Sequence, residues 1–385
     1  MVPQAPNRRL LIVVQEALFF TTHRLPVGRV MRDRGWEVHV AAPADPALAA
    51  QLSGEGFRVH AIPLRRGGLN PLAEIGLLLA LVRLFLSLRP RLLHLVSIKP
   101  VIWGGIAARL TFLPAVAHAV TGLGFLFIRQ DAKARIMRAL LVPLYRFALA
   151  HRNSLTIFQN DDDRAEFEKR RLLSRPQAMI RGCGVDMQRF SEQPEPSGDV
   201  IAMFPARLLG DKGVREFVGA AELLKKQGAT ARFVLVGRRD PDNPTDVGEA
   251  LVEAWVKSGI VEYWGFATDM PAMLAKAHVI VLPSYREGLP RGLIEAAAIG
   301  RAIVTTDAPG CRDVVRHEEN GLLVPVGDTA ATAAAIDRLL RDAGLRHKLA
   351  KRGREIAVAE FSVGQFVAES LAAYESLLKP RGEAL

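Results

Sequence analysis

The fold is decided by the stretch Ile201-Ala-Met-Phe-Pro-Ala-Arg207-Leu-Leu-Gly-Asp-Lys212-Gly213-Val-Arg-Glu-Phe217, a short apolar run followed by a polar turn and a helical pattern. Such a run before a turn is typical of a parallel strand buried on both faces. Because Arg offers a planar set of donors, Lys a point charge and the helix start unpaired N–H groups, the turn predicts a diphosphate site. For an Arg and Lys pair alone, a solvated basic loop is the competing interpretation.

Apolar runs of the same kind recur along the whole chain and are separated by longer segments with helical periodicity. In the first half they cover residues 10–14, 38–42, 59–62, 92–97, 115–121 and 154–158, and in the second half residues 201–206, 232–237, 261–265, 279–283, 302–306 and 322–326. Strands that alternate with helices form parallel sheets with helices on both faces. The sequence therefore predicts an α/β protein with two doubly wound domains.

Residues 191–199 predict the boundary between these domains. They include Pro194, Pro196, Ser197 and Gly198 and show no apolar periodicity, which is typical of a linker. We therefore expect one Rossmann-like domain over residues 1–190 and another over residues 200–385, with a terminal helix over 343–378 that can cross back to the first domain. Open α/β sheets bind ligands beyond the carboxyl ends of their strands, so we expect function on the loops that follow strands, at a cleft between the domains.

Composition excludes several classes of protein. Of the 385 residues, 49% are hydrophobic and 24% are charged, as in folded globular proteins, so a disordered, collagen-like or coiled-coil chain is not expected. Cys183 and Cys311 are too few for a disulfide framework or a four-ligand zinc site, which favours a reducing compartment. The polar residues 1–9 and the short run 10–14 do not form a signal peptide, so a cytoplasmic location is expected.

A second strand, turn and helix segment carries two glutamates, in Pro283-Ser-Tyr-Arg-Glu287-Gly288-Leu-Pro-Arg-Gly-Leu-Ile-Glu295. With a helix that begins near Leu289, Glu287 lies in the loop and Glu295 about two turns inside the helix, so the carboxylates face different parts of one ligand. A carboxylate accepts well from the paired hydroxyls of a sugar or ribose. The competing interpretation is that a Glu at a helix start serves only the helix dipole.

These segments together resemble the retaining glycosyltransferases of family 4, the group 1 glycosyl transferases, which include sucrose-phosphate synthases, mannosyltransferases and O-antigen enzymes. The resemblance covers essentially the whole chain and implies the GT-B fold, in which two Rossmann-like domains face each other across a cleft. In the second half it is carried by Arg207, Lys212-Gly213, Gly237, Trp264-Gly265-Phe266, Asp269, Glu287, Glu295, Gly310, Asp313-Val314 and Asn320-Gly321.

The resemblance also implies a role for each donor-site residue. Arg207 and Lys212 would hold the diphosphate of a nucleotide sugar and Glu287 would position its sugar, which makes these three the expected catalytic residues. Glu295 would accept from the ribose hydroxyls, and Gly265 and Phe266 would border the nucleobase. The full set of implied donor-binding residues is Arg207, Lys212, Gly213, Gly265, Phe266, Glu287, Gly288, Leu289 and Glu295. Front-face attack explains retention in the family, so no protein nucleophile, metal or cofactor is expected.

The first half resembles a narrower group that extends undecaprenyl-diphosphate-linked sugars in O-antigen, capsule or N-glycan assembly. This resemblance is carried by Phe19-Phe20-x-x-His23-Arg24-Leu25-Pro26, Ser97-Ile-Lys99-Pro100, Thr121-Gly122-Leu123-Gly124 and Gly182-Cys-Gly184-Val185-Asp186. It implies a lipid-linked saccharide acceptor, a UDP-linked donor and a place in lipopolysaccharide or related biosynthesis. The acceptor-side candidates are His23, His94, His118, Gly122 and Gly124, with structural histidines and glycine turns as the competing interpretation.

Two positions depart from the family pattern. Glu16-Ala17-Leu18 stands where many members carry a glycine pair after the first strand, so no contact with the donor diphosphate is assigned to the first domain. Asp313 stands where Glu is commoner, a change that preserves a role at a helix N-terminus.

Positive charge is concentrated in the first half. Residues 1–190 hold 27 basic and 13 acidic side chains, a net of +14, while residues 191–385 hold 24 and 27, a net of −3. Basic residues surround the Leu-rich segment 72–88 and flank the apolar segment 136–150: Arg65, Arg66, Arg83, Arg89, Arg91, Arg129, Lys133, Arg135, Arg138, Arg146 and Arg152. This pattern predicts peripheral binding to the anionic inner leaflet of the inner membrane. The competing interpretation is a packed helix and an Arg-rich solvated face.

Other functions compete with glycosyl transfer. A sugar-nucleotide epimerase of the same architecture would convert a donor without an acceptor. A basic nucleic-acid-binding protein would suit the charge, but the sequence has no aromatic-basic RNA motif or recognition helix, so nucleic acid is not an expected partner. Asp240-Pro-Asp242 resembles a metal-binding carboxylate pair, but its polar loop favours a solvated turn, and no metal site is expected.

Overall fold

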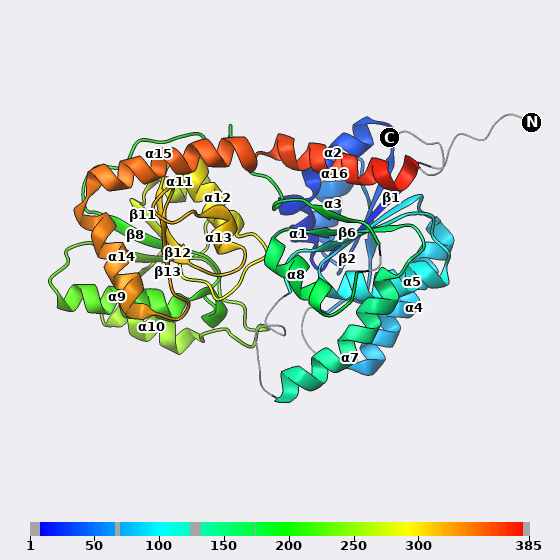
Figure 1. The fold of residues 1–385 in the computed structure, drawn as a ribbon, viewed down its shortest axis with the longest axis horizontal. Helices are drawn as coiled ribbons and strands as arrows, with labels where there is room; N and C mark the ends of the chain where they lie inside the picture. Colours follow the sequence, from blue (N-terminus) through cyan, green and yellow to red (C-terminus); the bar gives the residue numbers. More distant parts are fainter. Residues whose placement is uncertain (1–7, 66–69, 124–131, 174, 380–385) are drawn as a thin grey trace, which may run out of the picture. The chain divides into compact units, whose positions relative to one another are not determined.

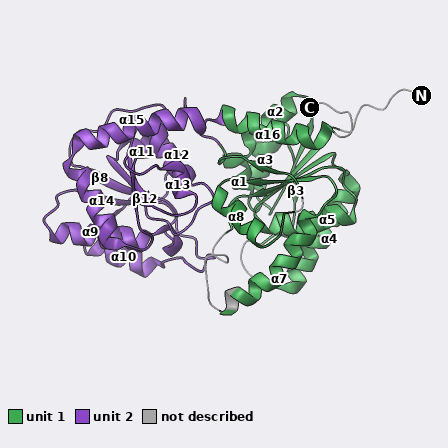
Figure 2. Cartoon of the chain, in the orientation of Figure 1, with its two compact units in different colours: residues 1–183, 364–385 green, residues 184–363 purple. Residues whose placement is uncertain are grey.

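The computed structural model describes residues 8–65, 70–123, 132–173 and 175–379 (Figure 1). The chain forms two compact units, coloured separately in Figure 2: unit 1 contains residues 1–183 and 364–385, and unit 2 contains residues 184–363. The Pro-rich segment 191–199 therefore belongs to unit 2. It is held there because Arg301 donates to the carbonyls of Gln193 and Pro194, and because Arg346 pairs with Glu195.

Unit 1 is built on a parallel sheet with the strand order β3-β2-β1-β4-β5-β6-β7 in the described residues. Its strands are β1 Arg9–Val13, β2 Glu37–Ala42, β3 Arg58–Ala61, β4 Leu92–Val96, β5 Val116–Val120, β6 Ser154–Phe158 and β7 Gln177–Met179. Side chains alternate between two apolar cores, with Leu10 and Ile12 on one face of β1 and Leu11 and Val13 on the other. Burial on both faces explains why these strands are apolar runs rather than alternating patterns.

Helices cover both faces of this sheet (Figure 1). One layer consists of α1 Ala17–His23, α2 Leu25–Asp33, α3 Pro46–Gly54 and α16 Val363–Leu378. The other consists of α4 Pro71–Leu88, a π-helical turn Pro100–Gly104, α5 Gly105–Leu110, α7 Ala132–Leu149 and α8 Asp161–Lys169. The end of the chain thus completes unit 1, because Phe366, Leu371 and Tyr374 of α16 are buried in the same core as β1 and β4.

Unit 2 is built on a second parallel sheet, of order β10-β9-β8-β11-β12-β13. Its strands are β8 Ile201–Pro205, β9 Arg232–Val236, β10 Glu262–Tyr263, β11 Val279–Leu282, β12 Ala302–Thr306 and β13 Leu322–Val324. Its helices are α9 Val214–Lys226, α10 Glu249–Lys257, α11 Met270–Ala275, α12 Arg291–Ala298, α13 Cys311–Val314, α14 Thr329–Arg341 and α15 Ala343–Glu360. α9 packs with α14 and α12 packs with α15, in layers on either side of the sheet (Figure 1).

The predicted α/β class with two doubly wound parallel sheets is confirmed, and every one of the twelve predicted strands is present within one or two residues. β7 was not predicted. It has three residues, lies at a sheet edge and has no fully buried side chain, so it leaves no apolar run in the sequence. Residues 343–378 form two helices instead of one, because the backbone at Phe361 and Val363 bonds to Val185 between α15 and α16.

Candidate functional site

The main cluster of predicted site residues lies in unit 2, where the strand order reverses. β8 and β11 are neighbours in the sheet, with β9 and β10 on one side and β12 and β13 on the other. The helices that follow them, α9 and α12, run to opposite faces of the sheet. Loops at such a reversal diverge, and open parallel sheets bind their ligands there. Arg207, Lys212 and Gly213 follow β8, and Glu287 follows β11.

The two loops touch through their backbones, and Gly213 makes this possible. It has φ +77°, and a Cβ atom at this position would lie 2.0 Å from the carbonyl oxygen of Pro283. The Tyr285 N–H donates to the carbonyl of Asp211 at 2.9 Å, and the Ser284 hydroxyl oxygen lies 3.1 Å from the same oxygen. Only glycine fits this contact without moving one loop, so the Lys212-Gly213 pair is a geometric requirement of the site.

Lys212 and Glu287 form an ion pair at the centre of this cluster. The Lys212 ammonium donates to both carboxylate oxygens, at 2.5 and 2.6 Å, and the Ser284 hydroxyl donates to one of them at 2.8 Å. The side chains are 19% and 12% exposed. A third loop fixes the Glu287 backbone, because its N–H donates to Pro309 at 3.0 Å and a Cβ on Gly310 would lie 2.6 Å from its carbonyl oxygen. Ser284 is a member of the site that the sequence did not identify.

Arg207 is held by a carboxylate from the loop after β9. Its guanidinium pairs with Asp240, whose side chain is only 11% exposed. The Asp240 N–H in turn donates to Asp246 at 3.0 Å, which closes the loop. Pro241 and Asp242 form an exposed turn, as the sequence predicts, but the Asp240 side chain points back to Arg207 instead of into solvent. Sequence could not show the contact, because it depends on Gly237 (φ +149°) lying against the Ala206 carbonyl, where a Cβ would be 2.0 Å from the oxygen.

Gly265 and Phe266 lie beyond the edge strand β10, next to the end of β9. Gly265 has φ +74°, and its carbonyl accepts from the Gly237 N–H at 2.9 Å. Phe266 is 59% exposed. The Arg238 guanidinium lies 6.0 Å from the centre of its ring. An exposed aromatic ring at the carboxyl edge of a parallel sheet is available to stack on a planar ligand.

Glu295 occupies a different environment from Glu287. It lies inside α12, is 9% exposed and accepts from Arg291 at 2.7 Å. Burial raises the pKa of its carboxyl, while the cations of Arg291 and Arg189 oppose the rise. Gly288 and Leu289 are buried just before α12, which begins at Arg291, two residues after Leu289, so Glu295 lies about one turn inside the helix.

The acceptor-side candidates of unit 1 come from different elements of the fold. The His23 ring stacks on Phe19 with ring centres 4.0 Å apart at the end of α1, and Gly122 follows β5 with φ +121°. His118 is fully buried in the middle of β5, and burial lowers its pKa to about 3. Its ring lies against α5, since a Cβ on Gly105 would be 3.0 Å from it. Gly124 lies outside the described residues.

Comparisons with known proteins agree with this geometry. The family model for "Glycosyl transferases group 1" matches residues 199–342, and that for "Glycosyl transferase 4-like" matches residues 9–160. A Campylobacter jejuni protein, the N,N'-diacetylbacillosaminyl-diphospho-undecaprenol alpha-1,3-N-acetylgalactosaminyltransferase, is 32% identical over 87% of this chain and 90% of its own length. The chain belongs to the group 1 glycosyltransferases. It is therefore an enzyme of glycosyl transfer, as the sequence predicts.

Solved structures share the fold of this glycosyltransferase. Sucrose-phosphate synthase from Thermosynechococcus elongatus superposes with a TM-score of 0.78 at 20% identity, over 97% of this chain and all of that one. Anabaena HepE in complex with UDP superposes with a TM-score of 0.74 at 19% identity, over 95% of this chain and all of that one. The two Rossmann-like units thus have the GT-B fold.

Proposed function

We propose that this glycosyltransferase moves a hexose or N-acetylhexosamine from a UDP-sugar to a saccharide linked to polyprenyl diphosphate, with retention of configuration, during the assembly of a bacterial surface polysaccharide. The cluster of Arg207, Lys212 and Glu287 at the reversal of the unit 2 sheet carries the donor half of this proposal. The acceptor half is supported by the Campylobacter relative, whose name gives a diphospho-undecaprenol-linked acceptor. HepE, which was solved with UDP, supports a uridine donor.

The two cations of the cluster suit the departing diphosphate. Cleavage of the bond between the sugar and its phosphate builds negative charge on the nucleoside diphosphate, and fixed cations stabilise that charge best when they are already in place. Lys212 is paired with Glu287 in the free enzyme, so the donor takes over a cation that the carboxylate held. Glu287 is then available to accept from the hydroxyls of the transferred sugar. Because the chain supplies both cations, we expect turnover without a divalent metal.

An exposed apolar face of unit 1 suits a lipid-linked acceptor. It consists of Leu72, Ile75, Leu79 and Leu86 on α4, Leu110 and Phe112 at the end of α5, and Ile136, Leu140 and Phe147 on α7. α5 packs against both α4 and α7, and Arg83, Arg135 and Arg146 on α4 and α7 are exposed. Among the described helices, α4 alone is long and apolar enough to cross a bilayer. Its opposite side is buried in the core, so we propose that it lies in the plane of an anionic bilayer surface.

Vesicle binding tests the membrane part of the proposal. The Ile75→Gln/Leu79→Gln variant should lose flotation with vesicles of phosphatidylglycerol and phosphatidylethanolamine. The bilayer would bury both apolar side chains, which contributes several kcal/mol to the free energy of membrane binding. The matched control is Leu223→Gln/Val256→Gln, which changes two exposed apolar side chains of unit 2. Equal flotation of both variants would remove α4 from the binding surface.

Donor consumption tests the reaction. The purified enzyme is incubated with UDP-, GDP- and ADP-sugars, with and without polyprenyl-diphosphate-linked saccharides and with EDTA, and the release of nucleoside diphosphate is measured. We expect acceptor-dependent release from one UDP-sugar, its loss in Lys212→Met, and its retention in Lys226→Met. Lys226 pairs with Glu222 on the exposed surface of α9, so it matches the Lys212–Glu287 pair in chemistry but not in place. Conversion of one donor to an isomer without acceptor would instead identify an epimerase.

A further inference from the structure

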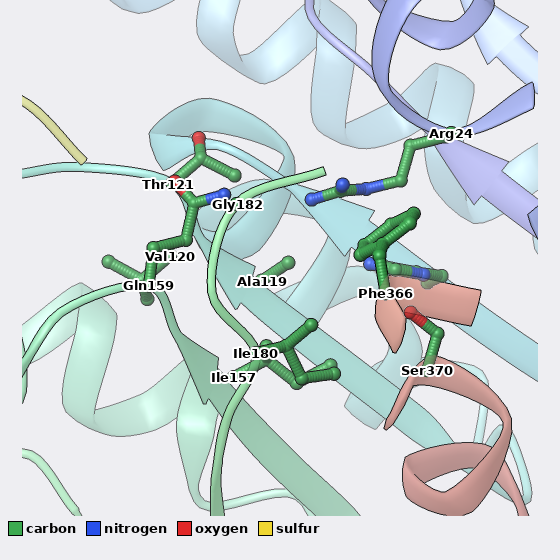
Figure 3. Close-up of a pocket in the computed structure, with 11 residues that line it drawn as sticks. Arg24, Ala119, Val120, Thr121, Ile157, Gln159, Ile180, Gly182, Phe366 and Ser370 are labelled. Atoms are coloured by element: carbon green, nitrogen blue, oxygen red, sulfur yellow. The ribbon is translucent and has the colours of Figure 1, made fainter. Parts of the chain in front are cut away.

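Unit 1 contains a small pocket that lies apart from the Lys212–Glu287 cluster. It lies at the carboxyl ends of β5 and β6 and is bordered by α16, with Arg24, Thr121, Gln159, Gly182, Phe366 and Ser370 in its wall (Figure 3). The cavity volume is about 10 Å³, enough for one water-sized group. Arg24 comes from the junction of α1 and α2 and points toward the space beside Gly182 (Figure 3).

Arg24 is a buried cation without a carboxylate partner in the described part of the chain. It is 3% exposed, and its Nε has no hydrogen-bond partner. Its Nη1 donates only to the neighbouring His23 carbonyl, at 3.2 Å. The Phe366 and Phe19 rings lie 5.3 and 5.9 Å from the guanidinium carbon. No Asp or Glu is in the pocket wall among the described residues.

The burial of Arg24 lowers the stability of the protein when no ligand is bound. A guanidinium loses its hydration when it is buried, and a partner charge or a full set of acceptors normally compensates for the loss. The burial lowers the pKa of Arg24, and the groups that oppose the shift are Cys183 and Tyr374, neither of which is a carboxylate. Aromatic faces recover only part of the hydration free energy. The described protein groups therefore leave part of the hydration free energy of Arg24 uncompensated.

His94 adds a second unpaired group to the same wall. Its Nδ1 is bonded to the Tyr374 hydroxyl, while its Nε2 has no partner in the described residues. Burial and the nearby Arg24 charge keep the pKa of His94 well below its usual value, so the ring is neutral. With Tyr374 as the donor to Nδ1, the ring hydrogen is on Nε2. Two N–H donors, one of them charged, then border a cavity of the size of one oxygen.

We propose that this pocket binds an anionic oxygen of the acceptor substrate, with Arg24 as its charged partner. The inference rests on the proposed function, because the expected ligand is a non-bridging oxygen of the diphosphate in the polyprenyl-linked acceptor. A carboxylate of an acidic sugar has the same chemistry and is the other source of such an oxygen. Two or more charge-assisted hydrogen bonds would then replace the hydration that Arg24 lost on folding.

Anion binding tests the pocket independently of catalysis. All variants carry Lys212→Met so that the unit 2 cluster contributes less to the signal, and melting temperature is followed against inorganic pyrophosphate and, separately, glucuronate. We expect a saturable rise with pyrophosphate, which Arg24→Met abolishes and the control Arg32→Met retains. Arg32 is a fair control because it also lies over an aromatic ring, that of Phe57, but pairs with Asp33. A rise with glucuronate alone would identify the carboxylate source, and no rise with either anion would overturn the proposal.

The stability of the anion-free protein separates a ligand role from a structural one. If the pocket is built for an anion, Arg24→Met should melt at the same temperature as its parent or higher, because it removes an uncompensated charge. A fall of more than about 4 °C, which is about 1 kcal/mol or more for a unit of this size, would show that Arg24 supports the fold and would overturn the proposal.

Kinetics link the pocket to the acceptor. In the enzyme with Lys212 intact, Arg24→Met should raise the KM for the lipid-linked acceptor by about tenfold to a hundredfold, the value of a charged hydrogen bond, whereas Arg32→Met should not change it. An unchanged acceptor KM would overturn the assignment to the acceptor. If the wild-type enzyme transfers no sugar at all, the proposed function fails, but the pyrophosphate titration still decides whether the pocket binds anions.

Discussion

The ion pair between Lys212 and Glu287 makes a quantitative prediction about unit 2. Both charges lie where the strand order of the unit 2 sheet reverses, and each is the other's principal partner in this structure. Replacing one of them leaves the other charge partly buried and poorly compensated. Replacing both residues leaves no uncompensated charge. The stability of Lys212→Met, Glu287→Gln and the double variant should therefore be strongly non-additive.

The structure sets the size of this effect. The ammonium lies 2.5 and 2.6 Å from the two carboxylate oxygens, and the side chains are 19% and 12% exposed. At an effective dielectric constant of about 20, unit charges about 4 Å apart attract by about 4 kcal/mol. The loss of hydration by both groups cancels part of this attraction. We expect a coupling free energy of about 1–3 kcal/mol between Lys212 and Glu287.

Urea unfolding of unit 2 measures the coupling. Trp255 and Trp264 lie in unit 2, so a Trp36→Phe/Trp103→Phe background makes tryptophan fluorescence report on that unit alone. The cycle is repeated with saturating UDP. If Lys212 moves to the diphosphate, the coupling with Glu287 should fall on UDP binding.

The exposed pair Lys226–Glu222 provides the reference cycle, because its side chains are 69% and 47% exposed and exposed helix pairs contribute less than about 0.5 kcal/mol. A Lys212–Glu287 coupling as small as this reference would contradict the picture of a partly buried pair. A coupling unaffected by UDP would contradict the transfer of Lys212 from carboxylate to diphosphate.

Three further predictions address the glycine contact, the exposed ring and the buried histidines. Gly213→Ala should destabilise unit 2 by about 2 kcal/mol more than Gly228→Ala in urea unfolding, since both have positive φ but only position 213 meets a backbone oxygen. Phe266→Ala should raise the donor KM by about tenfold in steady-state kinetics, the value of one base-stacking contact, without lowering the melting temperature. His118 has a folded pKa of about 3, below its unfolded value of about 6.5, so its contribution to stability is complete above pH 6.5 and is lost as pH falls toward 3. His118→Leu should therefore flatten the acid side of the stability profile measured by urea unfolding against pH.

The fold was predictable because its determinants are local. A parallel strand buried on both faces must be a short apolar run, and each of the twelve runs became a strand. The positions of Lys212 and Glu287 were predictable for a related reason: a residue that directly follows a strand lies at the carboxyl edge of the sheet wherever the rest of the chain goes. Lys212 and Glu287 were thus placed on site-forming loops without knowledge of their pairing.

Long-range contacts account for what the sequence did not show. Asp240 has the composition of a solvated turn, and only the approach of Gly237 to Ala206 brings it to Arg207. The position of His118 could have been inferred from strand alternation, because it shares a strand face with Val116 and Val120, whose partners are α5 and α7. Nothing around Arg24 in the sequence indicates its burial, which requires Phe366, more than 300 residues further along the chain.

The two units deal with buried charge in opposite ways, and this has a consequence for substrate binding. In unit 2, Glu287 and Asp240 neutralise Lys212 and Arg207, so the charges of this cluster are balanced, and a diphosphate bound as proposed would compete with the carboxylates for these cations. In unit 1, no described carboxylate neutralises Arg24, so an anionic oxygen gains a partner without displacing one. The affinity for the donor should therefore fall as Glu287 and Asp240 hold Lys212 and Arg207 more tightly. Binding at the proposed anion pocket should depend on Arg24 and on how much hydration the anion loses.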